Sequence, residues 1–464
     1  MRDILVFAIV ILLLPTSIRR PFVGLLLFSW LAYMRPQDLC WGFVRGMRLS
    51  FFVAIAMLAG WWAYEQGRRP FARWDFRTVA MLGLGCIVTI SYAGAQRHDE
   101  YTNSYFVEFV KILVIALFTT AQVDSRARLR VMFWTIALSL GFFGVKGGIL
   151  GILSGGNPIL RGPGGMLEDN NDFGLALVMN VPLLWYLGID EQKRAWVKHG
   201  TRIAVLLTVV TILLTHSRGA FLALVMTSLW IAWRSGHLVR AVGVLAFLAL
   251  LFPFVVPDAV LERLATIGDT KESSAHARLV AWGTALNMIA ANPLLGVGLR
   301  NFQTRFVEFA DVLAPGDETY VAHNSYLQIW AESGSFAFLI YLGLLFSVFL
   351  ACRHVLRLRL GRPDLAWAGN YARMMEATTV GFLCGAFFLN RGHFDLIYHW
   401  LALTTALVLV TRMAWSAAPV AATGQVPGRA RQITVRATAR GRLSGRWWPG
   451  GATPAGAIAT PGWR

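Results

Sequence analysis

The chain has 464 residues, of which 56% are hydrophobic and 15% are charged, and its mean hydropathy is +0.54. A soluble domain is about a quarter charged, so this composition excludes an ordinary soluble protein and predicts an all-α polytopic membrane protein. The formal net charge is +18. The four cysteines are scattered along the chain, so they predict neither a disulfide framework nor a zinc site.

Apolar runs that can cross or nearly cross a bilayer follow one another along most of the chain. At about 20 apolar residues for each span, they predict roughly twelve transmembrane helices. The first run has no small-residue cleavage site, so we expect a retained span rather than a signal peptide. The runs begin near Ile4, Phe22, Phe51, Val79, Phe106, Val131, Phe173, Ile203, Ala220, Val242, Ser335, Ala377 and Leu396.

Arginine and lysine residues in the connections predict the orientation, because such residues concentrate on the cytoplasmic side. Five connections are rich in them: residues 68–77, 126–130, 193–202, 234–240 and 353–373. The apolar runs between these five connections allow all of them to lie on the cytoplasmic side. The outward loops are then residues 94–104, 154–172, 216–219, 258–334 and 390–395.

Four parts follow from this orientation. We expect transmembrane helices over 1–257, a large periplasmic loop with the catalytic residues over 258–334, and C-terminal transmembrane helices over 335–413. Residues 414–464 contain arginines but no acidic residue and little apolar surface. They predict a disordered basic cytoplasmic tail that lies against anionic headgroups, with RNA binding as the alternative.

Two outward arginines are candidate site residues. Arg218 interrupts the apolar run in HSRGA, where burying its charge costs a few kcal/mol unless an anion or water receives it. Arg278 shares one face of a predicted amphipathic helix with Trp282, Ala285 and Ile289. The alternative for Arg218 is snorkelling to the headgroups, and for Arg278 it is a contact with lipid phosphate.

The stretch YVAHNSYLQIWAESG, residues 320–334, ends the large outward segment. His323 is its candidate proton acceptor, because imidazole takes a proton near neutral pH. Asn324 and Tyr326 are candidate substrate contacts. The alternatives are a hydrogen-bonded structural role for His323 and a helix-starting role for Asn324 and Ser325.

Two guanidinium groups and one imidazole predict a site that grips a diphosphate and deprotonates a hydroxyl. Lys146, Arg161 and Arg391 are further candidate glycan or phosphate contacts, with an interfacial anchor as the alternative for Arg391. The acidic stretch GMLEDNND, residues 165–172, predicts a helix cap, with a divalent-ion or sugar site as the alternative. We expect no cofactor and no catalytic metal, since no Walker or HExxH motif is present.

The motifs HSRGA, AR…W…NPLLGVGLRNF and AHNSYLQIWAESG resemble those of the O-antigen ligase and O-antigen polymerase superfamily. With the N-terminal MRDILV…RPFVGLLLFSWLAYMRPQ, GVKGGILGILSGGN and GPGGMLEDNND, the chain most resembles the O-glycosylation ligases associated with exosortase A systems. The resemblance covers residues 1–414. It implies a metal-independent, inverting glycosyltransferase of the GT-C type in a bacterial inner membrane, with its active site on the periplasmic face.

By the same resemblance, Arg218 and Arg278 would hold undecaprenyl diphosphate and His323 would activate the acceptor hydroxyl or assist departure of the diphosphate. The expected acceptor is a lipid A-core sugar. Alternatives are an O-antigen or exopolysaccharide polymerase, a protein O-glycosylation ligase and, from another class, a transporter or flippase, for which Glu108 and Lys111 are the candidate charges within a span. A scaffolding protein would leave the outward arginines unexplained.

Overall fold

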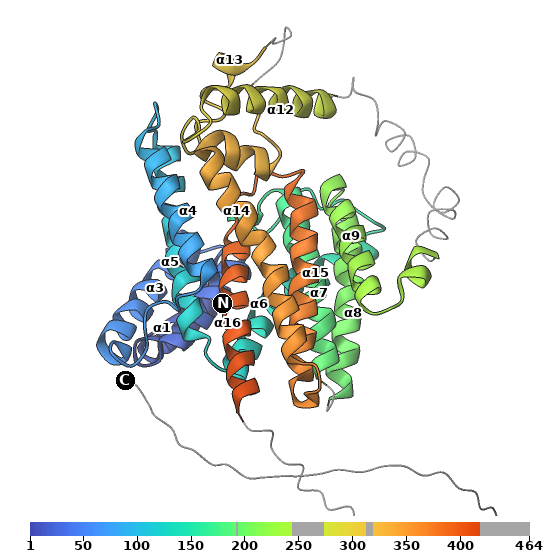
Figure 1. Ribbon diagram of the computed structural model, residues 1–464. Coiled ribbons are helices and arrows are strands. Elements are labelled where there is room, and N and C mark those ends of the chain that lie inside the picture. Colours follow the sequence, from blue (N-terminus) through green and yellow to red (C-terminus); the bar gives the residue numbers. More distant parts are fainter. Residues whose placement is uncertain (192–193, 244–272, 312–318, 418–464) are drawn as a thin grey trace, which may run out of the picture. The chain divides into compact units, whose positions relative to one another are not determined.

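The computed structural model describes residues 1–191, 194–243, 273–311 and 319–417. Within these ranges the chain is helical, with a single isolated β-bridge, so the predicted all-α class is confirmed. The helices (Figure 1) are α1 Arg2–Arg19, α2 Pro21–Tyr33, α3 Leu49–Gly60, α4 Phe76–Ala93, α5 Glu100–Gln122, α6 Arg126–Leu153, α7 Asn170–Asp190, α8 Ala195–Leu214, α9 Arg218–Arg234, α12 Ser273–Ala291, α13 Phe306–Phe309, α14 Ser325–Leu358, α15 Ala366–Ala386 and α16 Asp395–Ser416.

Seven of the described helices are long and apolar enough to cross a membrane: α4, α5, α6, α7, α8, α14 and α16. Two shorter apolar helices, Pro21–Tyr33 and Leu49–Glu65, lie near the N-terminus. The chain is therefore a polytopic membrane protein, and the count of roughly twelve spans stays a prediction. The run expected near Val242 lies mostly outside the described residues, as do 258–272, 312–318 and the tail from 418 onward.

Most helices begin a few residues before the apolar run that predicted them, because a polar cap and first turn precede the apolar segment. Asp75 caps α4 through the backbone N–H of Thr78, and Ser125 caps α6 in the same way. At the other end, α16 continues to Ser416, beyond the boundary expected at 414.

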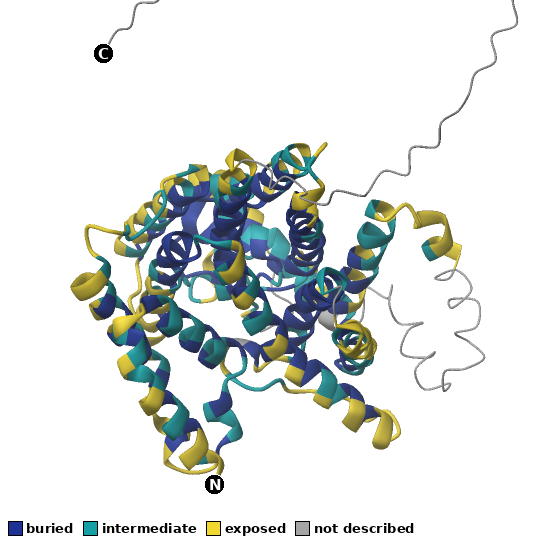
Figure 2. Cartoon of the chain, turned by 90° about the horizontal axis from the view of Figure 1, so that it is seen from below, coloured by how far each residue is buried: buried dark blue, intermediate teal, exposed yellow. Residues whose placement is uncertain are grey.

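The centre of the bundle is formed by α7 and α16, which are buried over most of their length, whereas α8 is largely exposed at the edge. Figure 2 shows buried residues in the middle of the bundle and exposed residues around it. Helices α15, α8, α9 and α6 pack around α7, while α5, α14 and α15 pack against α16. This arrangement brings helices from both halves of the chain into one core, which includes Phe133, Tyr371 and Trp400.

The basic connections are joined to one another by ion pairs. Arg69 contacts Asp124 just before α6, Arg130 contacts Glu191 after α7, and Arg234 contacts Glu376 on α15 with a distance of 2.8 Å. The Tyr371 hydroxyl donates to Asp190 (3.1 Å), which joins the connection after α14 to the one after α7. Together these contacts bring all five connections predicted to be cytoplasmic to one end of the bundle. We call it the basic end.

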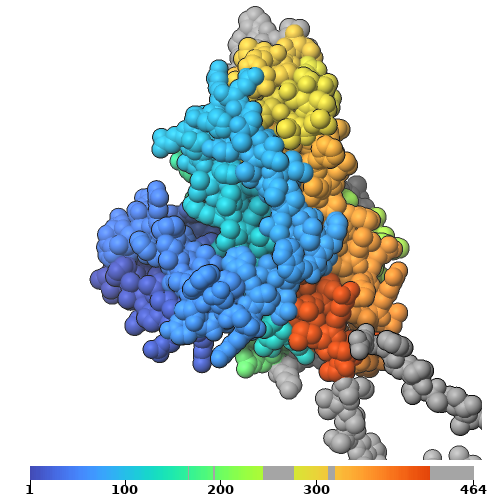
Figure 3. Space-filling model, turned by 60° about the vertical axis from the view of Figure 1, so that its left-hand side comes forward, coloured from blue at the N-terminus to red at the C-terminus, as the bar shows by residue number. Residues whose placement is uncertain are grey.

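At the opposite end, α12 lies across the bundle (Figure 1), and Figure 3 shows α12 in yellow far from the red end of α16. The turn after α12 docks on a kink in α14 at Gly334, which has φ +80°. The Ser335 N–H donates to Pro293 O (2.8 Å) and the Val297 N–H donates to Ala331 O (2.8 Å). A Cβ at Gly334 would overlap the Leu294 carbonyl, so only glycine fits this junction.

Candidate functional site

The candidate site lies at the end of the bundle under α12, where α7, α9 and α14 begin. The Asn170 amide at the start of α7 donates to Thr215 O (2.7 Å), which lies just before the turn into α9. Gly174 allows α7 to approach that turn closely, since a Cβ there would be 2.7 Å from the Cβ of Ala220. The start of α7 and the HSRGA turn are therefore held together.

Arg218 is the first residue of α9 and is half-buried. The preceding His216 has φ +53°, and the Ser217 side chain accepts a hydrogen bond from Ala220 N–H (3.2 Å). The turn therefore ends in a capped helix N-terminus. Such a terminus presents unpaired backbone N–H groups and the positive end of the helix dipole, which favour an anion beside Arg218.

Arg278 is half-buried on α12, one helical turn before Trp282. The Trp282 indole N–H donates to Ala322 O (3.0 Å), the carbonyl group of the residue before His323. Ala281, Ala285, Met288 and Ile289 form the buried face of α12, which is turned toward Ala322 and Ala331.

Phe387 and Phe388, just after α15, join the three predicted residues into one region. The Phe387 ring packs edge-on against Trp282 with 5.4 Å between ring centroids. A Cβ at Gly219, next to Arg218, would be 3.0 Å from the Cβ of Phe388. One aromatic pair thus contacts the neighbours of Arg218 and Arg278, and Trp282 extends the contact to the residue before His323. The sequence analysis missed this pair, because two phenylalanines at the end of a membrane span carry no distinctive signal.

His323 is half-buried and has φ +45°, a left-handed conformation that is rare for residues other than glycine. Burial lowers the pKa of His323, the positive charge of Arg278 lowers it further, and Asp169 opposes the shift. The imidazole is therefore neutral at pH 7 and able to accept a proton. Strained backbone of this kind gathers at functional sites.

The residues after His323 hold the start of α14. The Asn324 side chain accepts hydrogen bonds from Tyr326 N–H (3.0 Å) and Leu327 N–H (3.2 Å). The Tyr326 hydroxyl donates to Leu383 O (2.8 Å), and the Ser325 hydroxyl donates to Leu389 O (2.7 Å). Asn324 thus starts the helix as the alternative interpretation expected, and substrate contacts from Asn324 and Tyr326 stay predictions.

The carboxylates of the acidic stretch have separate partners. Asp169 caps α7 through Asn171 N–H (2.8 Å), which confirms the capping interpretation for this residue. Asp172 forms an ion pair with Arg391. Burial alone would lower the pKa of Arg391, but the hydrogen bond and negative charge of Asp172 outweigh it, so that pKa is raised. Among the described residues, no three His, Cys, Asp or Glu side chains gather as a metal site would require.

Arg161 and Lys146 lie at or beyond the edge of the candidate site. Arg161 is exposed and its backbone bridges to Asp169, so it borders the site. Lys146 is exposed on α6, about two turns before the helix ends at Leu153, and no described contact connects it to His323 or the two arginines. Their roles as glycan or phosphate contacts stay predictions.

A partly buried polar network surrounds Arg300, which follows the α12 turn and has φ +58°. The sequence analysis did not predict Arg300, Tyr101 or Tyr105 as site residues. Its guanidinium lies 4.7 Å and 4.2 Å from the ring centroids of Tyr101 and Tyr105. The Tyr105 hydroxyl is 3.4 Å from Nδ1 of His393. Burial and the charge of Arg300 lower the pKa of His393 to about 3, so His393 is neutral near pH 7. The signal in the sequence that could have found this network is the four-residue spacing of Tyr101 and Tyr105, which places two aromatic rings on one helix face where a cation can bind.

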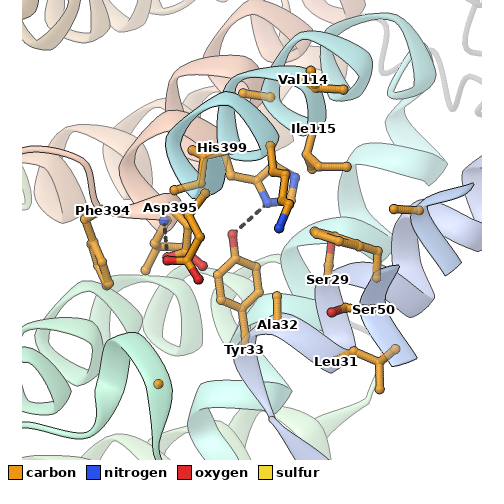
Figure 4. A pocket seen from close by; sticks show the side chains of 18 of the residues that line it. Ser29, Leu31, Ala32, Tyr33, Ser50, Val114, Ile115, Phe394, Asp395 and His399 are labelled. Atoms are coloured by element: carbon orange, nitrogen blue, oxygen red, sulfur yellow. Dashed lines mark hydrogen bonds between the residues drawn. The ribbon is translucent and has the colours of Figure 1, made fainter. Parts of the chain in front are cut away.

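A cavity of about 650 Å³ extends from Arg391 and Arg300 between α2, α3, α5 and α16. Its walls are mostly apolar, with a polar group where the Tyr33 hydroxyl meets Nδ1 of His399 (2.8 Å). Figure 4 shows Tyr33 and His399 pointing toward each other beside Asp395. Arg391 is the predicted site residue that borders this cavity, so the cavity and the His323 region meet through the Arg391–Asp172 pair.

The fold and the site define a polytopic membrane protein with a polar, arginine-containing site at one end of its helices. Residues 203–342 match the family described as O-antigen ligase, and this segment includes Arg218, Arg278 and His323. This match supports the resemblance to the O-antigen ligase superfamily on this segment. Residues 1–188 match a family of unknown function, DUF5935. No curated protein matches the chain.

Proposed function

We propose that this protein is a glycosyltransferase that moves a glycan from undecaprenyl diphosphate to an acceptor hydroxyl. The observation that carries the proposal is the contact path through Trp282, Phe387 and Phe388, which joins the surroundings of Arg218, Arg278 and His323. These segments are far apart in the sequence. Their meeting at a capped helix N-terminus supports a site for a diphosphate beside a proton acceptor.

In the proposed reaction, Arg218 and Arg278 hold the diphosphate oxygens and offset the charge that grows as it leaves. The acceptor oxygen attacks the anomeric carbon from the opposite face, and a new C–O bond forms with inversion. The bond between that carbon and the diphosphate oxygen breaks, releasing undecaprenyl diphosphate. His323 takes the hydroxyl proton, a role that its neutral state at pH 7 supports.

The acceptor we propose is a lipid A-core sugar, on the periplasmic face of a bacterial inner membrane. The gathering of the basic connections at the end opposite His323 supports this orientation. The cavity beside Arg391 gives room for an apolar part of one substrate, and Ala32→Trp, which fills it, is expected to raise KM more than it lowers kcat.

The test is glycan transfer in a deletion strain complemented with wild type, Arg218→Ala, Arg278→Ala or His323→Ala, with lipopolysaccharide separated on a gel. We expect each variant to abolish capped lipopolysaccharide while its membrane level stays normal. Arg357→Ala, an exposed arginine of α14 at the basic end, is the matched control and is expected to retain transfer. Near-normal transfer by His323→Ala would refute its role as the base.

The same strains identify the acceptor. Lipopolysaccharide that stays unchanged in every strain, with a glycosylated protein or an exopolysaccharide lost in the deletion, would refute the lipid A-core acceptor and keep the donor chemistry. Transport of a lipid-linked glycan with no new glycosidic bond would refute the transferase proposal as a whole.

A further inference from the structure

A second cavity, of about 710 Å³, lies at the basic end and has no part in the proposed reaction. It is formed by the C-terminal ends of α9 and α14, the turn that follows α14 and the first turns of α15. We call it the arginine pocket, because four arginines line it beside apolar walls. The lining used here is Arg234, Arg359, Arg362, Arg373, Leu356 and Leu360.

Two of the four arginines have carboxylate partners. Nε of Arg234 is 2.8 Å from a carboxylate oxygen of Glu376. The Arg362 guanidinium pairs with Asp364 (2.8 Å) and also donates to Trp415 O (2.9 Å). Their charges are offset within the protein.

The other two arginines leave the pocket with an excess of positive charge. Among the ion pairs of the described residues, none joins a carboxylate to Arg359 or Arg373. The Arg359 side chain packs against α15 at Gly369. A Cβ at Gly369 would be 2.5 Å from Cδ of Arg359 and 2.9 Å from Nη1 of Arg359. Arg373 follows Gly369 by one turn on the same face of α15. Glycine thus places one half-buried guanidinium near another.

Two like charges held together in a partly desolvated pocket repel each other, and an anion between them would offset this repulsion. Guanidinium groups bind phosphate oxygens in a bidentate manner. The negative ends of the α9 and α14 dipoles stabilise the arginines themselves, so the case for an anion rests on the two neighbouring guanidinium groups. The geometry therefore points to a phosphate-type ligand.

We propose that the arginine pocket binds the headgroup phosphate of an anionic phospholipid from the leaflet at the basic end. Apolar residues beside the arginines favour a lipid over a free anion: Leu360 is 77% exposed and Leu356 forms part of the wall. Residues 418–464 contain no acidic side chain. Basic pockets between membrane helices are known sites for anionic headgroups.

The test is native mass spectrometry of the full-length protein after delipidation and incubation with phosphatidylglycerol or phosphatidylcholine. We expect wild type to retain one phosphatidylglycerol in preference to phosphatidylcholine, and Arg359→Gln with Arg373→Gln to weaken this binding at least about tenfold. The control is Arg353→Gln with Arg357→Gln, which removes two exposed charges of α14 outside the pocket and is expected to bind like wild type.

Gly369→Ala is the second variant, because it displaces Arg359 without changing the net charge. It is expected to weaken phosphatidylglycerol binding while the thermal unfolding midpoint stays within a few degrees of wild type. Equal phosphatidylglycerol binding by all four proteins would refute lipid binding in the arginine pocket. It would indicate lipid bound nonspecifically around the membrane-facing surface of the helices. Displacement of the lipid by millimolar inorganic phosphate would refute the lipid proposal and indicate a site for a soluble anion.

Discussion

The two ends of the helix bundle differ in the ion pairing of their arginines and in the conformation of their backbone. At the basic end, several arginines pair with carboxylates across connections, as in Arg69–Asp124 and Arg234–Glu376, whereas none of the ion pairs of the described residues joins a carboxylate to Arg359 or Arg373 of the arginine pocket. At the site end, the backbone is strained. The four described residues other than glycine with positive φ are Arg35, His216, Arg300 and His323.

All four lie in or beside the HSRGA turn, the His323 segment or the cavity that meets them. Each left-handed residue costs about 1–3 kcal/mol, which the surrounding packing must offset. The comparison indicates that the basic end is built for orientation and stability, and that the site end gives up stability to hold side chains in particular positions.

The largest effect is expected from glycine replacement at the two ends. Gly334→Ala should prevent folding, because its φ of +80° is combined with overlap of a Cβ with the Leu294 carbonyl. Gly361→Ala at the basic end has φ +72° but meets nothing within 4 Å, so it should lower the free energy of unfolding by about 1 kcal/mol. Membrane yield and thermal unfolding measure both. Similar membrane yields and unfolding temperatures for Gly334→Ala and Gly361→Ala would contradict the expected difference between the two ends.

The pH dependence of transfer tests the neutral state of His323. Its lowered pKa means that the neutral form persists as pH falls below the ordinary value of about 6.5 and is lost only when pH passes the lowered pKa. We expect kcat/KM to stay level through pH 6.5 and then to fall about tenfold for each pH unit on the acid side. Arg278→Gln, if it retains measurable activity, should move that limb to higher pH. An acid limb centred above pH 7 would contradict the assignment.

Removing one partner from a buried ion pair should cost more at the site end. Asp172→Asn leaves Arg391, whose side chain is 23% exposed, without its anion, and should reduce the free energy of unfolding by about 3 kcal/mol. Glu191→Gln removes the partner of Arg130, which is 40% exposed, and should cost about 1 kcal/mol or less. Denaturation of both variants under one condition gives the comparison, and a larger loss for Glu191→Gln would reverse it.

The smallest effect is expected from Trp282→Phe. This change keeps an aromatic ring against Phe387 and removes the hydrogen bond to Ala322 O, which is worth about 1 kcal/mol. Transfer should fall about fivefold while membrane yield is unchanged. Trp233→Phe on the exposed surface of α9 is the control and should leave transfer unchanged. Equal transfer rates for Trp282→Phe and Trp233→Phe would show that the Trp282 hydrogen bond does not position His323.

The sequence alone predicted the features that depend on residue type or on neighbours along the chain. The apolar runs predicted the helices, because a membrane helix must satisfy its own backbone hydrogen bonds and therefore carries a continuous apolar signal. The basic connections predicted one shared end, and residue type predicted Arg218, Arg278 and His323 as phosphate-binding and proton-accepting groups. Polar caps such as Asp169 were also predictable, since a cap is a contact over two or three residues.

Only the tertiary structure placed Phe387 and Phe388 between the α9 turn and Trp282, or Arg300 on Tyr101 and Tyr105. The same is true of the Asp172–Arg391 pair and of Arg359 over Gly369. These contacts depend on which helices are neighbours and at what rotation. Periodicity specifies a helix and its apolar face but not its partner, so the packing of the whole bundle decides which polar groups meet.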